Sequence, residues 1–576
     1  MRILAALVAL ILVPSAPSSQ SVDPFAALPS TTGLVVSAND IASDVGAGVL
    51  AKGGNAVDAA VATALALAVT YPSAGNIGGG GFMVVRTPNG QSTTFDYREK
   101  APAKSTDTMF LGHDGSIDQS LTRSGYLAPG VPGTVSGLSL AHKRFGKLPW
   151  RDVVMPAADL ATYGFPLSAS LARSLNNEIG TPDAPGPMAR FPASVAAFGK
   201  ANGAPWIEGD LIFLTDLGKT IRTIATNGPE AFYTGTIADR IAADMAANGG
   251  LMTKADLTAY AARERAPIKG TFLGYEILSM PPPSSGGVTL VSMLNQLEEL
   301  EIQKRARMSA PAVHLVMEAM RRGYLDRARY LGDPDFVRIP MVSLFSKEHA
   351  RDLVKDVDPR EASSSAVLGR DILTQTQAPE PDETTHFSVL DRGGMAVSNT
   401  FTLEGGYGSH VVIKGTGILL NNEMGDFNRK PGLTDVNGTI GTPPNVIAPG
   451  KRMLSSMTPT IMTKAGRVVL ITGSPGSRTI INTVLNIVLN IAAWGMTGPG
   501  AVAAARLDHE WMPDRLTIEA DGIAPDVVTA LRTSGHDVRV QGRQGSAHSI
   551  WIDARGQAFG VADKRDPGAK ASKPAK

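Results

Sequence analysis

The chain has no cysteine among its 576 residues. This absence excludes disulfide bonds, thiolate nucleophiles and thiolate metal ligands together. The nine histidines show no HExxH or similar spacing, so the sequence predicts neither a metal site nor a bound cofactor. A chain of this length without covalent cross-links must therefore be stabilised by its hydrophobic core.

An excess of charge of either sign is also lacking. Lys and Arg total 54 against 53 Asp and Glu, which gives a formal net charge of +1. No basic block with interleaved aromatic residues occurs, so we expect no nucleic-acid partner. With 43% hydrophobic and 19% charged residues, the composition is that of a globular protein with a large core.

No apolar run in the sequence is long enough to cross a bilayer. The first run, Ile3 to Val13, follows Met1-Arg2 and precedes a stretch of small residues and prolines. This order is typical of a secretory signal, which we place approximately at residues 1–20. The sequence therefore predicts export, to the periplasm or outside the cell, without a stable membrane span. An uncleaved anchor or a lipid-associated segment is the alternative, although no cysteine is available for lipidation.

Two parts of the chain carry different secondary-structure signals. Residues 36–70 are typical of two packed helices around Gly53-Gly54, with Asn55 as N-cap of the second, and 133–330 is predicted to be mostly helical. The predicted strands are Phe82–Arg86, His386–Asp391, Met395–Thr402, Ile418–Leu420, Pro459–Thr463 and Val468–Thr472, and buried helices are expected over 61–70 and Ile480–Ala493. Hairpins combined with helices favour an α+β layered sandwich with the helices outside.

Two polar segments interrupt these patterns. Residues 356–383 show no sustained apolar period, and their composition predicts a flexible, exposed linker at whose end a cut is sterically feasible. The Lys-rich tail, residues 570–576, is predicted to be disordered.

Thr384 follows the linker directly and opens the run Thr384-Thr385-His386. A threonine hydroxyl is a poor nucleophile unless a base lies beside it, and the α-amine of the same residue can be that base. The amine is free only if the bond between Glu383 and Thr384 is cut. The chain is therefore either the precursor of a two-piece hydrolase or transferase, or Thr384 is an ordinary strand residue.

Seven motifs between about residue 35 and residue 563 occur in the order found in a known family. They are Gly53–Ala60, Asp96–Pro102, Pro132–Val135, Thr384–Ser388, Leu419–Met424, Leu454–Met457 and Gly473–Gly476. Each is weak alone, but together they are highly specific, and the chain resembles the γ-glutamyltranspeptidase family (γ-glutamyltransferase, glutathione hydrolase). The resemblance implies the N-terminal-nucleophile hydrolase fold, an αββα sandwich with two stacked sheets between helical layers. It also implies self-cleavage into a large subunit, residues 21–383, and a small subunit, residues 384–576, that form one catalytic domain.

The same resemblance assigns the site residues. Thr384 is implied to be the nucleophile that forms a γ-glutamyl ester, and Thr402 is implied to hydrogen-bond it. The implied ligands of the γ-glutamyl α-carboxylate are Arg98, Ser455 and Ser456, those of its α-ammonium are Glu404, Glu423 and Asp426, and the oxyanion donors are Gly476 and Ser477. An arginine fork suits a carboxylate, and three acids in one pocket suit a ligand that brings a cation.

Two positions depart from the family pattern. Ser477 replaces the second glycine of the oxyanion hole, which keeps a backbone N–H but narrows the φ/ψ choice, so we expect an effect on rate rather than on mechanism. Residues 428–450 resemble the loop that covers the pocket in some bacterial members, with Asn437 where those carry a tyrosine. We expect this replacement to leave the pocket more open to water or to larger acceptors.

The expected function is that of an exported, self-processing γ-glutamyl hydrolase/transferase. It would cleave glutathione and related γ-glutamyl compounds and pass the group to water or to the amine of an amino acid or peptide. A second hypothesis is a glutaryl-type acylase of the same fold, related to cephalosporin acylases, but glutaryl groups lack the α-ammonium that the three acids suit. A third is a non-catalytic exported binding protein, against which the two threonines Thr384 and Thr402 argue.

Overall fold

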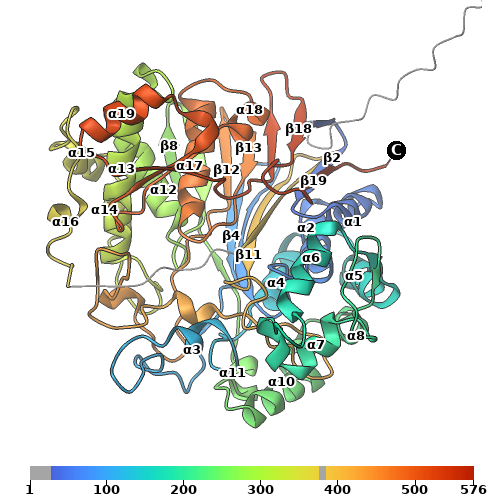
Figure 1. Cartoon of the computed structure of the whole chain (residues 1–576). Coiled ribbons are helices and arrows are strands. Elements are labelled where there is room, and N and C mark those ends of the chain that lie inside the picture. Colours follow the sequence, from blue (N-terminus) through green and yellow to red (C-terminus); the bar gives the residue numbers. More distant parts are fainter. Residues whose placement is uncertain (1–26, 375–383, 576) are drawn as a thin grey trace, which may run out of the picture.

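The computed structural model describes residues 27–374 and 384–575 and has an α+β architecture built on two stacked sheets (Figure 1). Neighbouring strands within both sheets are antiparallel. Sheet I contains, in spatial order, β19 (Lys570–Ser572), β2 (Gly33–Ser37), β10 (Thr385–Asp391), β11 (Ala396–Thr402), β3 (Gly80–Arg86), β4 (Ser92–Asp96) and β7 (Arg263–Arg265). Sheet II contains β1 (Leu28–Ser30), β18 (Ala558–Val561), β17 (Ser549–Ile552), β13 (Arg467–Thr472), β12 (Thr460–Lys464), β9 (Tyr275–Ser279) and β8 (Ile268–Phe272).

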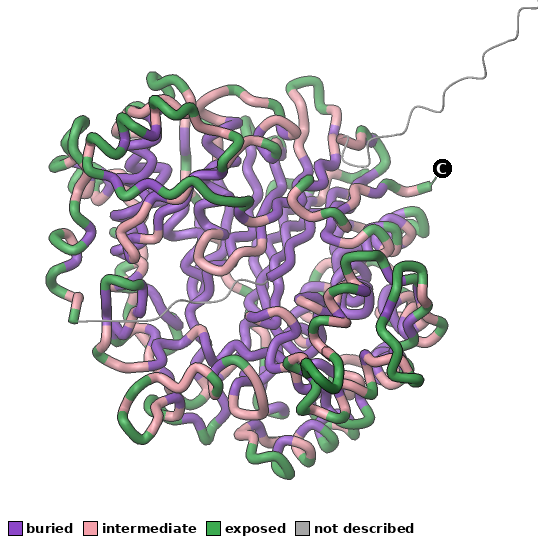
Figure 2. The backbone as a smooth tube through the Cα atoms, viewed as in Figure 1, coloured by how far each residue is buried: buried purple, intermediate pink, exposed green. Residues whose placement is uncertain are grey.

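Three layers of buried apolar side chains hold the stack together. Helix α2 (Ala56–Thr70) packs on β10 and β11 of sheet I. Leu34, Val84 and Ile471 belong to the layer between the sheets. Helix α12 (Gly286–Glu299) packs on β8 and β9 of sheet II, and α13 (Ala310–Tyr330) and α17 (Thr479–Ala492) pack on α12. Figure 2 shows the central strands as buried and the exposed backbone on outer helices and loops. The predicted α+β sandwich is therefore confirmed.

The other helices of six or more described residues lie outside the sheets. They are α1 (Asp40–Ala51), α4 (Thr134–Phe145), α5 (Trp150–Tyr163), α6 (Ala169–Ile179), α7 (Pro192–Phe198), α8 (Thr215–Asn227), α10 (Thr236–Ala247), α15 (Lys347–Val354), α18 (Gly498–Ala503) and α19 (Pro525–Thr533). Two small sheets accompany them, β14 (Leu507–Asp508) with β15 (Leu516–Glu519) and β16 (Val538–Gln541), and β5 (Phe165–Pro166) with β6 (Leu211–Ile212).

The predicted helix pair near the N-terminus is confirmed as α1 and α2. Asn55 caps α2 because its side chain accepts hydrogen bonds from the N–H groups of Val57 and Asp58, and the Asp58 carboxylate accepts from the N–H of Asn55. Every residue of α2 is buried. Its many alanines leave room for close packing against sheet I, so the predicted buried helix at 61–70 is also confirmed.

The sequence predictions of secondary structure were incomplete in one stretch and wrong in another. The stretch 133–330 is mostly helical, as predicted, but it also includes strands β7, β8 and β9, in which short alternating patterns such as buried Ile268 beside exposed Lys269 are easily hidden among helical signals. Ile418–Leu420 forms no strand and makes only isolated bridges, in which Leu419 pairs with Val412 and Leu420 with Gly78.

The Lys-rich tail is ordered over part of its length. Lys570–Ser572 forms β19, which pairs with β2 at the edge of sheet I. Nζ of Lys570 lies 2.8 Å from a carboxylate oxygen of Asp44. The prediction of disorder was wrong because backbone pairing with an open sheet edge needs no apolar side chains.

The described part of the predicted linker is also held in place. Ser365 is completely buried, its N–H donates to Asp514, and its carbonyl accepts from the Trp511 indole. Short helix α16 (Ser365–Leu368) begins here. Most residues of 356–374 are exposed, as expected, but the contacts of Ser365 hold this part against the rest of the chain. Residues 375–383 and the predicted signal at 1–20 lie outside the described residues. Across 27–374 and 384–575, no helix is long and apolar enough to cross a membrane.

Candidate active site

Thr384 and Thr402 lie side by side at one end of the predicted hairpin, which is confirmed as β10 and β11. The register pairs Thr385 with Phe401, so Thr384 stands beside the last residue of β11. Thr384 is 6% exposed, and its Oγ1 donates a hydrogen bond to Oγ1 of Thr402 over 3.3 Å. The Thr402 Oγ1 also accepts from the N–H of Glu404 at 2.8 Å. The two hydroxyls expected to act together are in contact.

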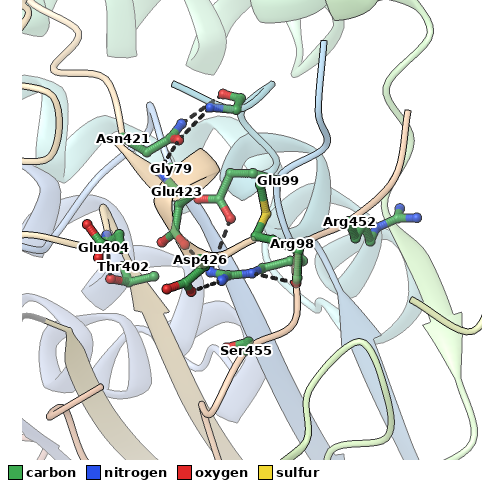
Figure 3. A network of polar contacts seen from close by, with 12 residues as sticks. Gly79, Arg98, Glu99, Thr402, Glu404, Asn421, Glu423, Asp426, Arg452 and Ser455 are labelled. Atoms are coloured by element: carbon green, nitrogen blue, oxygen red, sulfur yellow. Dashed lines mark hydrogen bonds and ion pairs between the residues drawn. The ribbon is translucent and has the colours of Figure 1, made fainter. Parts of the chain in front are cut away.

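Arg98 lies at the centre of a cluster of carboxylates (Figure 3). It follows β4 and is completely buried. Its Nη1 lies 2.5 Å from Oε2 of Glu423 and 3.5 Å from Oε2 of Glu99, and its Nη2 donates to Asp426. The sequence assigned Arg98 and two of these acids to opposite charges of one ligand. In this structure those side chains pair with one another.

Burial and charge oppose each other in this cluster. Burial raises the pKa of Glu99 to about 8, although the Arg98 charge lowers it. Burial also raises the pKa of Glu423, against the effect of Arg98. For Arg98, burial lowers the pKa, but the charges of Glu423, Asp426 and Glu99 outweigh burial and the pKa is raised. The guanidinium thus stays charged while the carboxyl groups outnumber it, which makes the cluster attractive to a second cation.

The remaining predicted ligands line the same cavity. We call it the acid pocket; its volume is about 60 Å³, and the predicted residues in its wall are Arg98, Thr384, Thr402, Glu404, Glu423, Asp426, Ser455, Ser456 and Ser477. Glu404 has a φ of +79°. A left-handed conformation costs roughly 1–2 kcal/mol for a residue with a Cβ, so the surrounding structure must hold Glu404 in place. Oγ of Ser456 accepts from Nη2 of Arg327 at 3.0 Å.

The two expected oxyanion donors lie in the turn between β13 and α17. No described residue accepts a hydrogen bond from the N–H of Gly476 or of Ser477. Gly476 has a φ of +124° and Ser477 a φ of +48°. Both values lie in the region that favours glycine, so Ser477 carries the backbone strain that a glycine would avoid.

Comparisons with known proteins agree with this geometry. The sequence profile of the Gamma-glutamyltranspeptidase family matches residues 42–573. The Glutathione hydrolase proenzyme of Escherichia coli (strain K12) is 44% identical over 555 residues, covering 96% of this chain and 94% of that protein. The chain belongs to the γ-glutamyltranspeptidase family.

Two further relatives extend the comparison. The Acylase ACY 1 proenzyme of Pseudomonas sp. (strain SE83) is 35% identical over 543 residues, covering 93% of this chain and 92% of that protein. The crystal structure of cephalosporin acylase from Bacillus halodurans superposes with a TM-score of 0.81 at 24% identity, covering 98% of this chain and all of that one. That likeness shows the fold, so the N-terminal-nucleophile hydrolase sandwich expected of a γ-glutamyltranspeptidase is confirmed. As a member of this family the chain is an enzyme.

The sequence reasoning missed two residues, one beside Arg98 and one in the wall of the acid pocket. Glu99 lies within the motif that marks γ-glutamyltranspeptidases, but only the structure shows its carboxylate beside Arg98, with no hydrogen bond from any described residue. Arg327 lies in the last turn of α13, 129 positions before Ser456, and lines the acid pocket. Basic residues are so common in the last turn of a helix that the position of Arg327 gives no functional signal in the sequence.

Part of the segment 428–450, which resembles the loop that covers the pocket in some γ-glutamyltranspeptidases, forms a wall of the acid pocket. Asn428, Thr439, Thr442 and Asn445 line the acid pocket. Asn437 is exposed and does not line it, and its N–H donates to Asp435 at 2.8 Å.

A buried group of metal-ligand type lies away from this site. The nearest ligand atoms of His314, Glu318 and His536 lie within 4.8 Å of one another. The Glu318 carboxylate is, however, ion-paired with both Arg321 and Arg322. Two guanidinium groups on the only acid oppose a metal cation, so these described residues fit one poorly.

Proposed function

We propose that the chain is an exported, self-processing γ-glutamyl hydrolase/transferase that acts on glutathione and related γ-glutamyl compounds through an ester on Thr384. The observation that carries the proposal is the arrangement of Arg98, Glu423 and Asp426 in the pocket that Thr384 and Thr402 also line. Opposite charges are concentrated beside a hydroxyl pair, as a zwitterionic acyl group requires.

Self-processing would cut the bond before Thr384. Glu383 lies outside the described residues, and the names of the relatives as proenzymes support a precursor. The fragments 21–383 and 384–576 would stay together because both sheets contain strands of each. In sheet I, for example, β10 of the small subunit pairs with β2 of the large one.

Donor binding would proceed by exchange of ion pairs. The α-carboxylate and α-ammonium of a γ-glutamyl group are attached to one carbon, so their partners must be neighbours. Arg98 and the acids Glu423 and Asp426 meet this condition, since they already contact each other. On binding, the ligand carboxylate replaces the acids at Arg98, while its ammonium takes over the acids. Each buried charge remains paired throughout.

The chemical steps that follow use the two threonines and the two expected oxyanion donors. The freed α-amine of Thr384 takes the proton from its own Oγ1, which attacks the γ-carbonyl carbon, while Thr402 orients the hydroxyl. The N–H groups of Gly476 and Ser477 stabilise the oxyanion. The amide C–N bond breaks, the proton passes to the leaving amine, and the γ-glutamyl ester remains. Water or an amine then releases it by the reverse proton path.

A glutaryl-type acylase is the second candidate, favoured by the similarity to the Acylase ACY 1 proenzyme. A glutaryl group would displace Glu423 and Asp426 from Arg98 without supplying the ammonium that replaces Arg98 as their partner. An unpaired buried charge is costly, so the γ-glutamyl donor is favoured.

Gel electrophoresis under denaturing conditions tests the processing. Two fragments that meet at Glu383/Thr384 are expected for the wild type, and one full-length band for Thr384→Ala. A single band in both would end the self-processing proposal. Edman sequencing of both fragments locates the cut and shows whether residues 1–20 have been removed. Glutamate release from a γ-glutamyl anilide, compared with glutarate release from a glutaryl anilide, separates the two donor classes.

A further inference from the structure

A cavity lined by three arginines lies at the end of the two sheets away from Thr384. We call it the arginine cavity; its volume is about 360 Å³, and the arginines in its wall are Arg86, Arg392 and Arg467. Strand β10 runs from Thr385, beside the nucleophile, to the turn that contains Arg392. Because a strand advances about 3.3 Å per residue, β10 separates this turn from Thr384 by roughly 20 Å. The arginine cavity and the acid pocket share no described residue.

The three arginines come from both sheets. Arg86 is the last residue of β3, and Arg392 lies in the turn between β10 and β11, so both belong to sheet I. Arg467 is the first residue of β13 in sheet II. Nη2 of Arg86 donates a hydrogen bond from one sheet to the other, to the carbonyl of Gly466 at 2.6 Å. The wall of the arginine cavity therefore combines positive charges from the two layers.

Arg86 is the unusual member of this set, because its charge is buried without an acid. The residue is 7% exposed, and no carboxylate of residues 27–374 or 384–575 is ion-paired with its guanidinium. Its Nε and Nη1 make no hydrogen bond to a described residue, but only Nε is enclosed by protein. Nη1 is therefore the donor available to an occupant of the arginine cavity. Since arginine is rarely buried unpaired, the structure favours an anion at this position.

The single acid among the described residues of this wall does not neutralise the arginines. Asp391 accepts hydrogen bonds from the N–H of Ala56 at Oδ2 and from the N–H of Met395 at Oδ1, both at 3.0 Å. Arg392 and Arg467 are exposed, and neither side chain makes an ion pair within the described chain. The arginine cavity therefore has an excess of positive charge, and a cleft lined by one sign of charge attracts the opposite sign.

We propose that the arginine cavity binds a phosphate group, either as inorganic phosphate or as the monoester of a small molecule. A phosphate group carries close to two negative charges and at least three strong acceptor oxygens, and guanidinium groups match its geometry. One carboxylate has too few charges and oxygens for three arginines. The wall also includes the apolar side chains of Leu390 and Val468, which can contact the organic part of an ester. This site does not depend on the reaction at Thr384.

Isothermal titration calorimetry of the purified protein tests the site, with inorganic phosphate, phenyl phosphate and benzoate as probes at constant ionic strength. We expect phosphate to bind at one site per chain, and benzoate at least tenfold more weakly. Arg86→Gln should weaken phosphate binding at least tenfold, as for the loss of a hydrogen bond between charged groups. Arg555→Gln is the matched control and should bind as the wild type does, because Arg555 is exposed next to Gly556 of the wall but does not line the cavity.

Arg392→Gln and Arg467→Gln test the site without a change in a buried residue. Both side chains are exposed, so both variants should fold, and each should bind phosphate about three- to tenfold more weakly than the wild type. Thermal unfolding gives a second readout, since a ligand of the folded state raises its stability. Saturating phosphate should raise the Tm of the wild type by about 2 °C more than that of Arg86→Gln, a difference in which general salt effects cancel.

The phosphate probes also distinguish the two sources of the ligand. Tighter binding of phenyl phosphate than of inorganic phosphate would identify an ester as the ligand, and equal binding would identify the free ion. The site would be overturned if neither probe binds, or if phosphate binds equally to the wild type and to the Arg86, Arg392 and Arg467 variants. Benzoate binding as tight as that of phosphate would also overturn the assignment of a phosphate group.

Discussion

Thr384 lines both the acid pocket and a second cavity of about 390 Å³, whose wall includes Thr385, Gly476 and His548, and the polar groups around the two cavities are satisfied in different ways. In the acid pocket, Arg98 is paired with Glu423 and Asp426 before any ligand arrives. Beside the second cavity, Thr385 Oγ1 and His548 Nδ1 are buried and make no hydrogen bond to any described residue. A ligand of the acid pocket must replace every charge pair that it breaks, because an unpaired buried charge is costly. We therefore expect a strict choice of donor at the acid pocket.

The largest expected effect comes from Arg98→Gln. This change removes the proposed carboxylate ligand and leaves Glu423 and Asp426 without their buried partner. Because breaking a buried pair costs about 3–5 kcal/mol, we expect kcat/KM for a γ-glutamyl anilide to fall about a thousandfold. Arg98→Lys keeps the charge but loses the fork, and an intermediate loss is expected. Circular dichroism checks that each variant is folded. Activity of Arg98→Lys equal to that of the wild type would contradict the role of the fork.

Glu423→Gln tests the proposed ammonium ligand. The ratio of kcat/KM for a γ-glutamyl anilide to that for a glutaryl anilide should fall about a hundredfold, because only the first substrate carries a cation and a hydrogen bond to a charged group is worth about 1.5–3 kcal/mol. The ratio cancels any general loss of stability. If the ratio stays the same, the pocket does not recognise the ammonium, and this result would support the glutaryl hypothesis.

Thr402→Val removes one hydroxyl from the pair at the junction of the two cavities. It deletes the hydrogen bond from Thr384 and leaves the N–H of Glu404 without its acceptor. We expect kcat to fall about tenfold while KM for the acceptor is unchanged. Thr402→Ser is the matched control and should retain most of the activity. A serine variant as slow as the valine variant would mean that packing, rather than the hydroxyl, matters.

A smaller effect on stability is expected from Glu99. Burial raises its pKa from the ordinary value of 4.5 to about 8 in the folded chain. Between these two values the folded chain holds a proton that the unfolded chain has released, so this group stabilises the fold most below about pH 4.5 and less as the pH rises to 8. As the pH rises from 5 to 8, the Tm of Glu99→Gln should therefore fall less than the Tm of the wild type. Parallel melting curves for the two would contradict the raised pKa.

Much of the fold and of the acid pocket could be predicted, because the signals are local. Asn55 is a helix cap by residue type, and the hairpin that carries Thr384 alternates over a short distance. The tail strand β19 was missed because its partner β2 lies more than 500 positions away, and a sheet edge accepts almost any backbone.

The second cavity could not be predicted for a related reason. Thr385, Gly476 and His548 come from three separated segments, and their meeting is a property of sheet packing rather than of any motif. The Arg98 cluster differs in this respect, since the family resemblance already named Arg98, Glu423 and Asp426. The motifs did not predict that these side chains pair with one another.

The smallest expected effect concerns Ser477, which lines the acid pocket next to a glycine that lines the second cavity. Its φ of +48° is strained for serine but not for glycine. Ser477→Gly should therefore raise the free energy of unfolding by about 1 kcal/mol. Because the backbone N–H is retained, kcat and the acceptor KM should change less than about threefold, whereas loss of an oxyanion donor costs about a hundredfold or more. Urea unfolding and steady-state kinetics check the two halves. A large fall in kcat would mean that the Ser477 hydroxyl itself takes part in the reaction. The backbone strain at this position would then have a catalytic purpose.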